Sequence, residues 1–345
     1  MLAPGSSNFP YTPDPLVLFN IPIDIKYWDL HGFLLLPTLW LLTAGAPVLL
    51  ARDKGGGKGA SAEAMKRDAS FSYLAFIIAI AVLQAFVWDT VGAEIGIWQF
   101  NPEKCTDVGG TASLLPLEEI LWLFHHVLKA ALWQLKVSEF TQVLGNDERP
   151  PEPLPDWARS GGTLALAGVT LAGALTLAGD MDSYKCLGLV GAFFAPVGVI
   201  ILNLGTRYWR SHWKLFLLGW LPPGLWTVFI DALGQWQGVW YFPPRFLSGI
   251  NDPFEGWFKL DIAAVYLVST FAVTATGAII LAAADELARQ RQPLQQREGD
   301  EERPQEAGTA SASRRTARTD DLTLGDLAAF IFESTFPKLV PRRIQ

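Results

Sequence analysis

Long apolar runs, separated by shorter polar stretches, occupy most of the chain. A helix needs about 20 mostly apolar residues to cross the hydrocarbon core of a membrane. Seven runs reach this length, at approximately 30–51, 70–90, 114–136, 161–179, 184–205, 213–232 and 260–284. Acidic and basic residues interrupt the third run, and a Pro pair interrupts the sixth. The pattern predicts an all-α integral membrane protein with seven transmembrane helices.

The basic residues of the loops predict the orientation of these helices, because Lys and Arg concentrate on the cytoplasmic side. The loops after the first, third and fifth runs carry several Lys or Arg residues, and the segment after the seventh is rich in Arg. The intervening loops carry little more than Lys104 and Arg245. We therefore expect the N-terminus outside and the C-terminus on the cytoplasmic side.

The C-terminal segment from residue 285 onward has a different composition. Residues 286–321 are mainly Gln, Glu, Arg, Pro, Ser and Thr, a mixture that buries too little apolar surface to fold. Apolar residues then recur on one helical stripe over 322–336. This stripe predicts an amphipathic helix that lies on a membrane or a partner, or a tail helix that docks loosely and has no function of its own.

Composition excludes several classes of function. The 345 residues are 50% hydrophobic and only 18% charged, with a net charge of −7, so a basic nucleic-acid-binding face is not expected. Two Cys residues cannot form a disulfide framework or a Cys-based zinc site. Four His residues are too few for a His-rich di-iron centre. We therefore expect neither a metal site nor a nucleic-acid partner.

A fourteen-residue motif occurs twice. It runs over 89–102 and again over 231–244, a constant offset of 142 residues (231 − 89), and an Asp, two Gly, a Trp, a Phe and a Pro recur without a gap. A weaker echo follows each copy, as Pro-Leu-Glu-Glu at 116–119 and Pro-Phe-Glu-Gly at 253–256. Such self-similarity indicates a repeat architecture.

The repeat predicts two parallel three-helix units joined by one linking helix, with both motif loops on the outer side. The expected divisions are an N-terminal extramembrane segment, a first repeat, a linker with the fourth helix, a second repeat and a polar tail. Their ranges are 1–29, 30–136, 137–183, 184–284 and 285–345.

Each repeat places an Asp at the end of its middle helix and a Glu at the start of its last helix. Acidic residues inside a membrane are costly and by default functional. The candidate catalytic residues are Asp89, Glu118, Glu119, Asp231 and Glu255. The alternative is that each acid caps a loop or a first helical turn, where the helix dipole favours it.

Aromatic residues cluster around these acids in the sequence. The candidates for lining a site are Trp88, Trp98, Phe100, Trp122, Trp240 and Phe242, together with His126. Some of the Trp residues also suit the aromatic belt at a membrane interface. His126 is expected to be a hydrogen-bond partner of the acids or an interior packing residue rather than a metal ligand.

These residues resemble a known family. The run Trp88-Asp89, then Gly96-Ile-Trp-Gln-Phe100, then Pro116-Leu-Glu-Glu is similar to the membrane-integral lycopene cyclases, which comprise heterodimeric bacterial, fused archaeal and fungal cyclase-domain forms. The resemblance covers about residues 25–285. The chain departs from the family pattern at Trp122, Leu123 and His126, where two Phe and a Gln are usual, and at Gly256, where a second acid is often found.

The resemblance implies a carotenoid cyclase that acts on lycopene or a related polyene within the membrane. Cyclisation of a polyene end needs a proton donor, a base and aromatic faces that stabilise the cationic intermediate. A carboxylic acid in apolar surroundings can remain protonated near neutrality. The substrate carries no diphosphate and the chain has no Gly-rich dinucleotide loop, so we expect no cofactor, although assistance by a reduced flavin stays open. Membrane lipid and other carotenoid-pathway enzymes are the expected partners.

Two alternatives remain at this stage. Another membrane terpenoid cyclase would use the same acids and aromatic residues, and both β and ε rings are compatible with them. A non-enzymatic three-one-three transporter would also show parallel repeats. An opsin is excluded because residues 261–284 contain no Lys.

Overall fold

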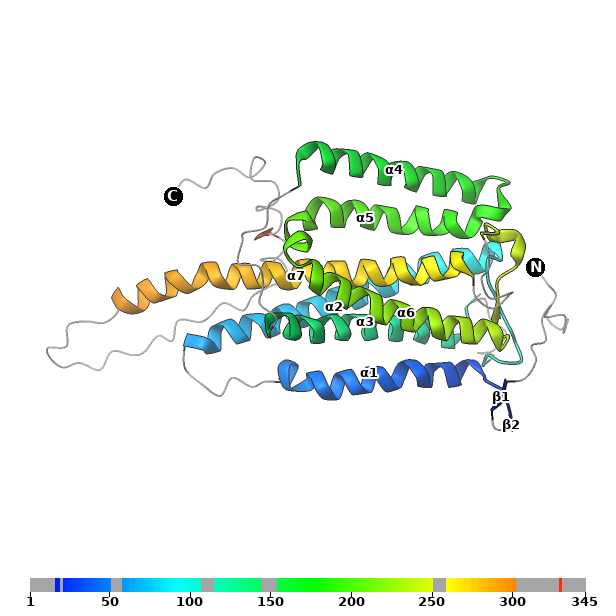
Figure 1. Ribbon diagram of the computed structural model, residues 1–345, viewed down its shortest axis with the longest axis horizontal. Helices are drawn as coiled ribbons and strands as arrows, with labels where there is room; N and C mark the ends of the chain where they lie inside the picture. The colour runs from blue at the N-terminus through cyan, green and yellow to red at the C-terminus, as the bar shows by residue number, and fades with distance from the viewer. Residues whose placement is uncertain are drawn as a thin grey trace.

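The computed structural model describes most of the chain as a helical bundle. The described residues are 16–18, 21–50, 58–106, 115–143, 154–250, 259–301 and 329–330. The long helices are α1 (Tyr27–Leu50), α2 (Lys58–Ile95), α3 (Leu117–Val143), α4 (Asp156–Ala178), α5 (Lys185–Ser211), α6 (Trp213–Trp236) and α7 (Leu260–Glu301). They run roughly along one direction in Figure 1.

Short elements occupy the same end of the bundle as the start of α1 (Figure 1). Strands β1 (Leu16–Leu18) and β2 (Ile21–Ile23) form an antiparallel pair before α1. Strands β3 (Gln99–Phe100) and β4 (Trp240–Tyr241) form a second pair. Two 3-10 helices, η1 (Asp182–Tyr184) and η2 (Pro244–Phe246), complete the described elements outside the bundle.

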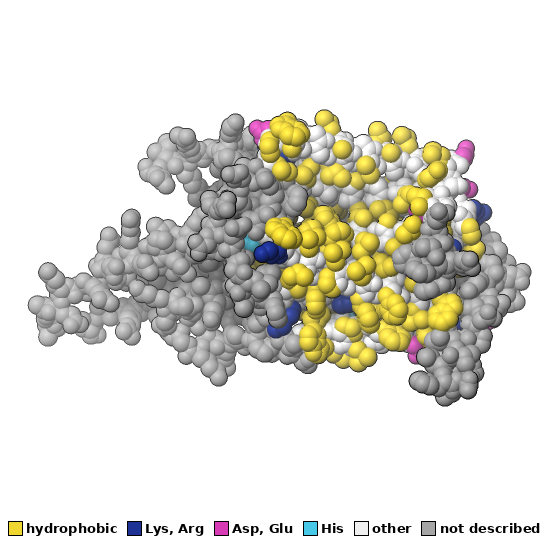
Figure 2. Space-filling model, viewed as in Figure 1, with side chains coloured by type: hydrophobic (Ala, Val, Ile, Leu, Met, Phe, Trp, Pro, Cys, Tyr) yellow, Lys and Arg dark blue, Asp and Glu magenta, His cyan; other side chains and the backbone are white. Residues whose placement is uncertain are grey.

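Among the described residues, four helical stretches are long and apolar enough to cross a membrane. They are Asp156–Ala178, Asp182–Gly205, Trp213–Trp236 and Leu260–Ala284. Large apolar side chains such as Leu36, Leu164 and Leu171 are exposed, and hydrophobic side chains cover most of the described surface in Figure 2. These helices indicate an integral, multi-pass membrane protein. Helices α1, α2 and α3 cover the other three predicted runs, and their crossing of a membrane stays a prediction.

Helices α3 and α7 form the centre of the bundle. Helix α3 contacts α1, α2, α6 and α7, and α7 contacts α2, α3, α5 and α6. Helix α4 lies at one side and packs against α5 (Figure 1). Side chains from α3 and α7 therefore reach the interior between the two halves of the chain.

Two helices extend beyond the apolar runs that predicted them. Helix α2 begins at Lys58 rather than near residue 70, and α7 continues to Glu301 rather than ending near residue 284. The extensions are rich in Ala, Glu, Gln, Lys and Arg, which favour helix irrespective of hydropathy. The first part of the predicted polar segment, up to Glu301, is therefore helical. Of the predicted helix at 322–336, only 329–330 lie within the described residues, and these two are helical.

Candidate active site

The two motif loops meet at one end of the bundle. Gln99 pairs with Tyr241 and Phe100 pairs with Trp240 in the antiparallel β3–β4 ladder. The side-chain amide of Asn101 also donates a 2.9 Å hydrogen bond to the Gly238 carbonyl. Both motif loops therefore lie at the same end of the bundle, and their predicted location on the outer side of a membrane stays a prediction.

The glycines of the motif allow the same local geometry in both loops. Gly96 and Gly238 have φ angles of 85° and 62°, a left-handed conformation that favours glycine. A Cβ atom on Gly92 would overlap the Trp98 ring, and one on Gly234 would overlap the Trp240 ring. Each Trp therefore folds back onto the end of its preceding helix.

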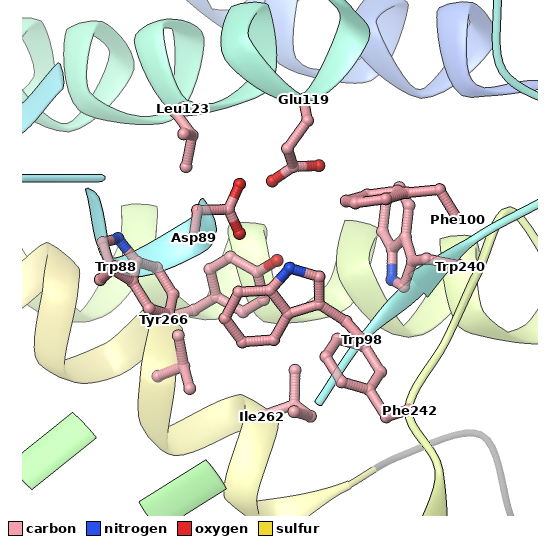
Figure 3. A pocket seen from close by; sticks show the side chains of 11 residues that line it. Trp88, Asp89, Trp98, Phe100, Glu119, Leu123, Trp240, Phe242, Ile262 and Tyr266 are labelled. Atoms are coloured by element: carbon pink, nitrogen blue, oxygen red, sulfur yellow. The ribbon is translucent and has the colours of Figure 1, made fainter. Parts of the chain in front are cut away.

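The space between the two loops and the central helices contains a small cavity. Its volume is about 30 Å³, and the lining residues are Trp88, Asp89, Trp98, Phe100, Glu119, Leu123, Trp240, Phe242, Ile262, Val265 and Tyr266. Figure 3 shows the carboxyl groups of Asp89 and Glu119 facing each other above the rings of Tyr266 and Trp98. Both halves of the chain thus contribute to a cavity with two acids and an aromatic lining.

Glu119 is the acid that faces the cavity from α3. Its side chain is buried, and the hydroxyl group of Tyr27 donates a hydrogen bond to it. Asp89, from the end of α2, lies within hydrogen-bonding range of Glu119. One Asp89 oxygen has no hydrogen-bond partner among the described residues. The two carboxyl groups and the Tyr27 hydroxyl therefore form one polar cluster.

Glu118 points in a different direction from Glu119. It is fully buried, and one of its carboxyl oxygens accepts a hydrogen bond from the backbone N–H of Thr106. It does not line the cavity. Consecutive residues on a helix point in directions about 100° apart. Glu118 thus fixes the loop after β3, whereas Glu119 faces the cavity.

Asp231, the motif counterpart of Asp89, lies near the end of α6, behind the cavity wall. The side-chain amide of Gln235 donates a 2.5 Å hydrogen bond to it, and Tyr266 and Trp240 lie beside its carboxyl group. The side chain is buried, yet it is not among the cavity-lining residues. Asp231 is therefore placed to act through Tyr266 and Trp240.

Five of the seven predicted lining residues line the cavity. They are Trp88, Trp98, Phe100, Trp240 and Phe242. Trp98 lies at the centre of this group, with ring centroids 5.3 Å from Trp88 and 6.2 Å from Phe242. Trp122 supports the group from outside, 5.4 Å from the Trp240 ring. The lining is therefore built mainly by the two motif copies.

His126 lies away from the acids. Its two ring nitrogens are 3.0 Å from the Thr227 hydroxyl and 3.2 Å from the Ser269 hydroxyl, between α3, α6 and α7. The expected hydrogen bonds to the acids are thus replaced by bonds to hydroxyl groups, because His126 faces the next turns of the neighbouring helices. Within the described ranges, no three His, Cys, Asp or Glu side chains gather as metal ligands would.

Lys104 joins the N-terminal segment to both motif loops. Its ammonium group lies 2.8 Å from the Asp24 carboxylate and donates a 2.7 Å hydrogen bond to the Gln237 carbonyl. The Lys104 ammonium holds the pKa of Asp24 below its usual value. The backbone N–H of Tyr27 donates to the Lys104 carbonyl. These contacts bring the start of α1, and with it the Tyr27 hydroxyl, to the cavity.

Sequence reasoning missed several residues of the site. Tyr27 lies before the first apolar run, and Tyr266, Ile262 and Val265 lie inside the seventh, where nothing distinguishes them from lipid-facing residues. The position of α7 between the two halves reveals the role of the three α7 residues, and the contacts of Lys104 reveal that of Tyr27. Glu255 lies outside the described residues, so its predicted equivalence to Glu118 stays a prediction.

Two curated proteins are similar to this chain. Both are named lycopene beta-cyclase and come from two strains of Halobacterium salinarum. Each is 27% identical over 178 residues, which cover 51% of this chain and 69% of the relative. The resemblance to lycopene cyclases that the motifs predicted is therefore confirmed at the level of a distant relative. No protein-family model matches the chain, and no solved structure gives a significant match.

Proposed function

We propose that the chain is a carotenoid cyclase, which closes ionone-type rings at the ends of lycopene or a related polyene within the membrane. The observation that carries the proposal is the aromatic cavity in which the Asp89 and Glu119 carboxyl groups face each other. The distant similarity to lycopene beta-cyclases supports the same reaction. Both ring types, β and ε, are compatible with this arrangement.

The reaction needs an acid and a base in one apolar space. Two carboxyl groups in contact hold one shared proton more readily than two negative charges, so a protonated and an ionised group coexist. In our proposal the protonated member of the Asp89–Glu119 pair delivers its proton to the terminal double bond of the polyene. The resulting cation closes the ring by forming a carbon–carbon bond. A carboxylate then removes a proton from a ring carbon, so that the product is an isomer of the substrate and no oxidation or reduction occurs.

The other residues of the site stabilise or orient these groups. The Tyr27 hydroxyl holds one oxygen of Glu119, which leaves the other oxygen directed toward Asp89. The rings of Trp98, Trp240 and Trp88 line the space in which the cation forms. Each aromatic face contributes roughly 0.5–2 kcal/mol of cation–π attraction. The same rings exclude water, which would otherwise capture the cation as an alcohol.

The cavity of about 30 Å³ holds one or two water molecules but no polyene end group. We therefore expect the aromatic rings to move aside when the substrate enters. The β3–β4 pair joins the two loops that carry Trp98 and Trp240, so the wall of the cavity can shift as one unit.

The proposed arrangement in the membrane is seven helices in two parallel triplets, with the N-terminus outside and the C-terminus on the cytoplasmic side. In this arrangement α2 and α3 of the first triplet correspond to α6 and α7 of the second. The packing supports it, because α3 contacts α6 and, equivalently, α7 contacts α2. The matching φ angles at Gly96 and Gly238 support the equivalence of the two motif loops.

Expression in a lycopene-accumulating bacterial host tests the function directly. The wild-type chain should convert lycopene into cyclised pigments, which chromatography separates from the substrate. Glu119→Gln and Asp89→Asn remove the exchangeable proton and should each lower product at least a hundred-fold. Glu118→Gln should lower it less, because an amide oxygen can still accept the Thr106 N–H.

The matched control is Glu94→Gln, an exposed acid on α2 five residues after Asp89. It should leave product at the wild-type level. Full activity in both Glu119→Gln and Asp89→Asn at equal expression would refute the acid pair as the proton apparatus. Cyclisation of another terpenoid but not of lycopene would keep the chemistry and replace the substrate.

A further inference from the structure

Asp261 is a buried acid that no part of the proposed reaction uses. It is the second residue of α7 and only 4% exposed. Its carboxyl group accepts a 2.9 Å hydrogen bond from the backbone N–H of Ser248, and the Ser248 hydroxyl donates its one proton between the two carboxyl oxygens, at 2.9 and 3.0 Å. An acid with such a complete set of partners has a defined structural task.

The task becomes clear from the first half of the chain. Glu118 is the second residue of α3, and it accepts the backbone N–H of Thr106. Thr106 lies six residues after Phe100, and Ser248 lies six residues after Phe242, so the two loop residues keep the 142-residue offset of the motif. The acids themselves are one residue further apart (261 − 118 = 143). Each half thus has an acid at the same helical position bound to the same loop position.

We infer that Asp261, rather than Glu255, is the counterpart of Glu118 in the second half and that it is a positioning residue for the cavity. On one side it holds Ser248, in the loop that follows Trp240 and Phe242. On the other side it belongs to the first turns of α7, which carry Ile262 and Tyr266. One carboxylate therefore fixes two walls of the cavity relative to each other.

The expected effect of Asp261 on catalysis rests on the proposed cyclase function, whereas its role in holding the loop against α7 does not. Removal of the Asp261 contact should let the loop and the start of α7 separate. Cys186 reports this separation independently of activity, because it is fully buried in α5 and close to both Asp261 and Asp231. The chain has one other cysteine, Cys105, which substitution by Ala removes.

The experiment compares Asp261→Asn and Asp261→Glu in the full-length Cys105→Ala protein, reconstituted in lipid vesicles. N-ethylmaleimide labelling of Cys186 is followed by mass spectrometry, and lycopene turnover is measured in the same vesicles. Asp261→Asn should accelerate labelling at least five-fold and lower kcat about ten-fold, with KM within two-fold of the parent value. Asp261→Glu should restore most of both properties, because it keeps a carboxylate. Asp156→Asn, at an exposed acid on α4, is the matched control and should match the parent.

Parental labelling and parental kcat in Asp261→Asn would overturn the inference, as would a rise in KM with unchanged kcat. If Asp261→Asn fails to fold, Ser248→Ala is the second variant, because it removes only the hydroxyl contact with Asp261. It should accelerate the labelling of Cys186 by a smaller factor. Unchanged labelling in a folded Ser248→Ala protein would then overturn the inference. If the parent cyclises no lycopene, the proposed function fails, and the labelling of Cys186 alone decides the role of Asp261.

Discussion

At the residue scale, the adjacent acids Glu118 and Glu119 have different surroundings, although nothing in the sequence motif distinguishes them. Glu119 meets the Tyr27 hydroxyl and Asp89 at the cavity, and Glu118 meets the backbone of Thr106. Neighbouring residues on a helix point in directions about 100° apart, so Glu119 faces the cavity and Glu118 binds the loop. In the second half, Asp261 accepts the backbone N–H of Ser248, as Glu118 accepts that of Thr106.

The loop beside Glu118 contains a thiol whose chemistry reports on this arrangement. Burial, together with the neighbouring Glu118 and Glu119 carboxylates, raises the pKa of Cys105 to about 12. An unfolded thiol titrates at about 8.5. From pH 8.5 to 12 the unfolded chain therefore binds fewer protons than the folded chain, and the stability that this thiol contributes falls as the pH rises.

Alkylation of Cys105 by iodoacetamide in the Cys186→Ala protein should therefore keep accelerating by about ten-fold per pH unit up to pH 10, because only the thiolate reacts. Glu118→Gln removes one neighbouring negative charge and should increase the rate at each pH. The unfolded protein is the control, and its rate should level off near pH 9. A plateau near pH 9 in the folded protein would show that Cys105 is not held as a neutral thiol.

At the element scale, the close approach of the motif Trp residues to the ends of α2 and α6 sets the shape of the cavity. Gly92→Ala would push the Trp98 ring away, and that ring also contacts Trp88 and Phe242. Such overpacking costs about 1–3 kcal/mol. We expect Gly92→Ala to lower the unfolding temperature, measured by differential scanning fluorimetry. It should also yield at least ten-fold less cyclised product, measured by pigment analysis.

Gly168→Ala is the control for this substitution. A Cβ atom at Gly168, in the exposed helix α4, would meet nothing within 4 Å. Alanine favours helix by up to about 1 kcal/mol over glycine, so this variant should be as stable as the wild type or slightly more stable, with unchanged product. Equal behaviour of the two variants would show that the contact between Gly92 and Trp98 does not shape the site.

The helices were predictable where hydropathy and helix propensity agree. The seven apolar runs correspond to α1–α7. Hydropathy locates only the apolar part of a helix, so it did not predict the start of α2 at Lys58 or the end of α7 at Glu301. The repeat predicted that Asp89 and the motif aromatic residues come together. It could not predict Tyr266 or Asp261, because the register of α7 depends on a loop of different length in the second half.

At the scale of the whole molecule, the fold brings together groups that are far apart in the sequence at one end of a membrane bundle. Asp89 comes from α2, Glu119 from α3 and Tyr266 from α7, while the two paired loops close the cavity around them. A second apolar core, around Tyr73, Ala130 and Tyr208, lies apart from the core that surrounds the cavity. The arrangement therefore separates the helical scaffold from the reacting groups.

The central claim is that a proton from the acid pair starts a redox-neutral ring closure. The direct test is conversion of lycopene by the purified, reconstituted protein in D₂O, followed by mass spectrometry of the pigment. Protonation at one carbon and loss of a proton from another predict one deuterium per ring formed, in a product that is otherwise an isomer of lycopene. Glu119→Gln should give no such product. A cyclised pigment without deuterium, or a folded wild-type protein that leaves lycopene unchanged, would contradict the account.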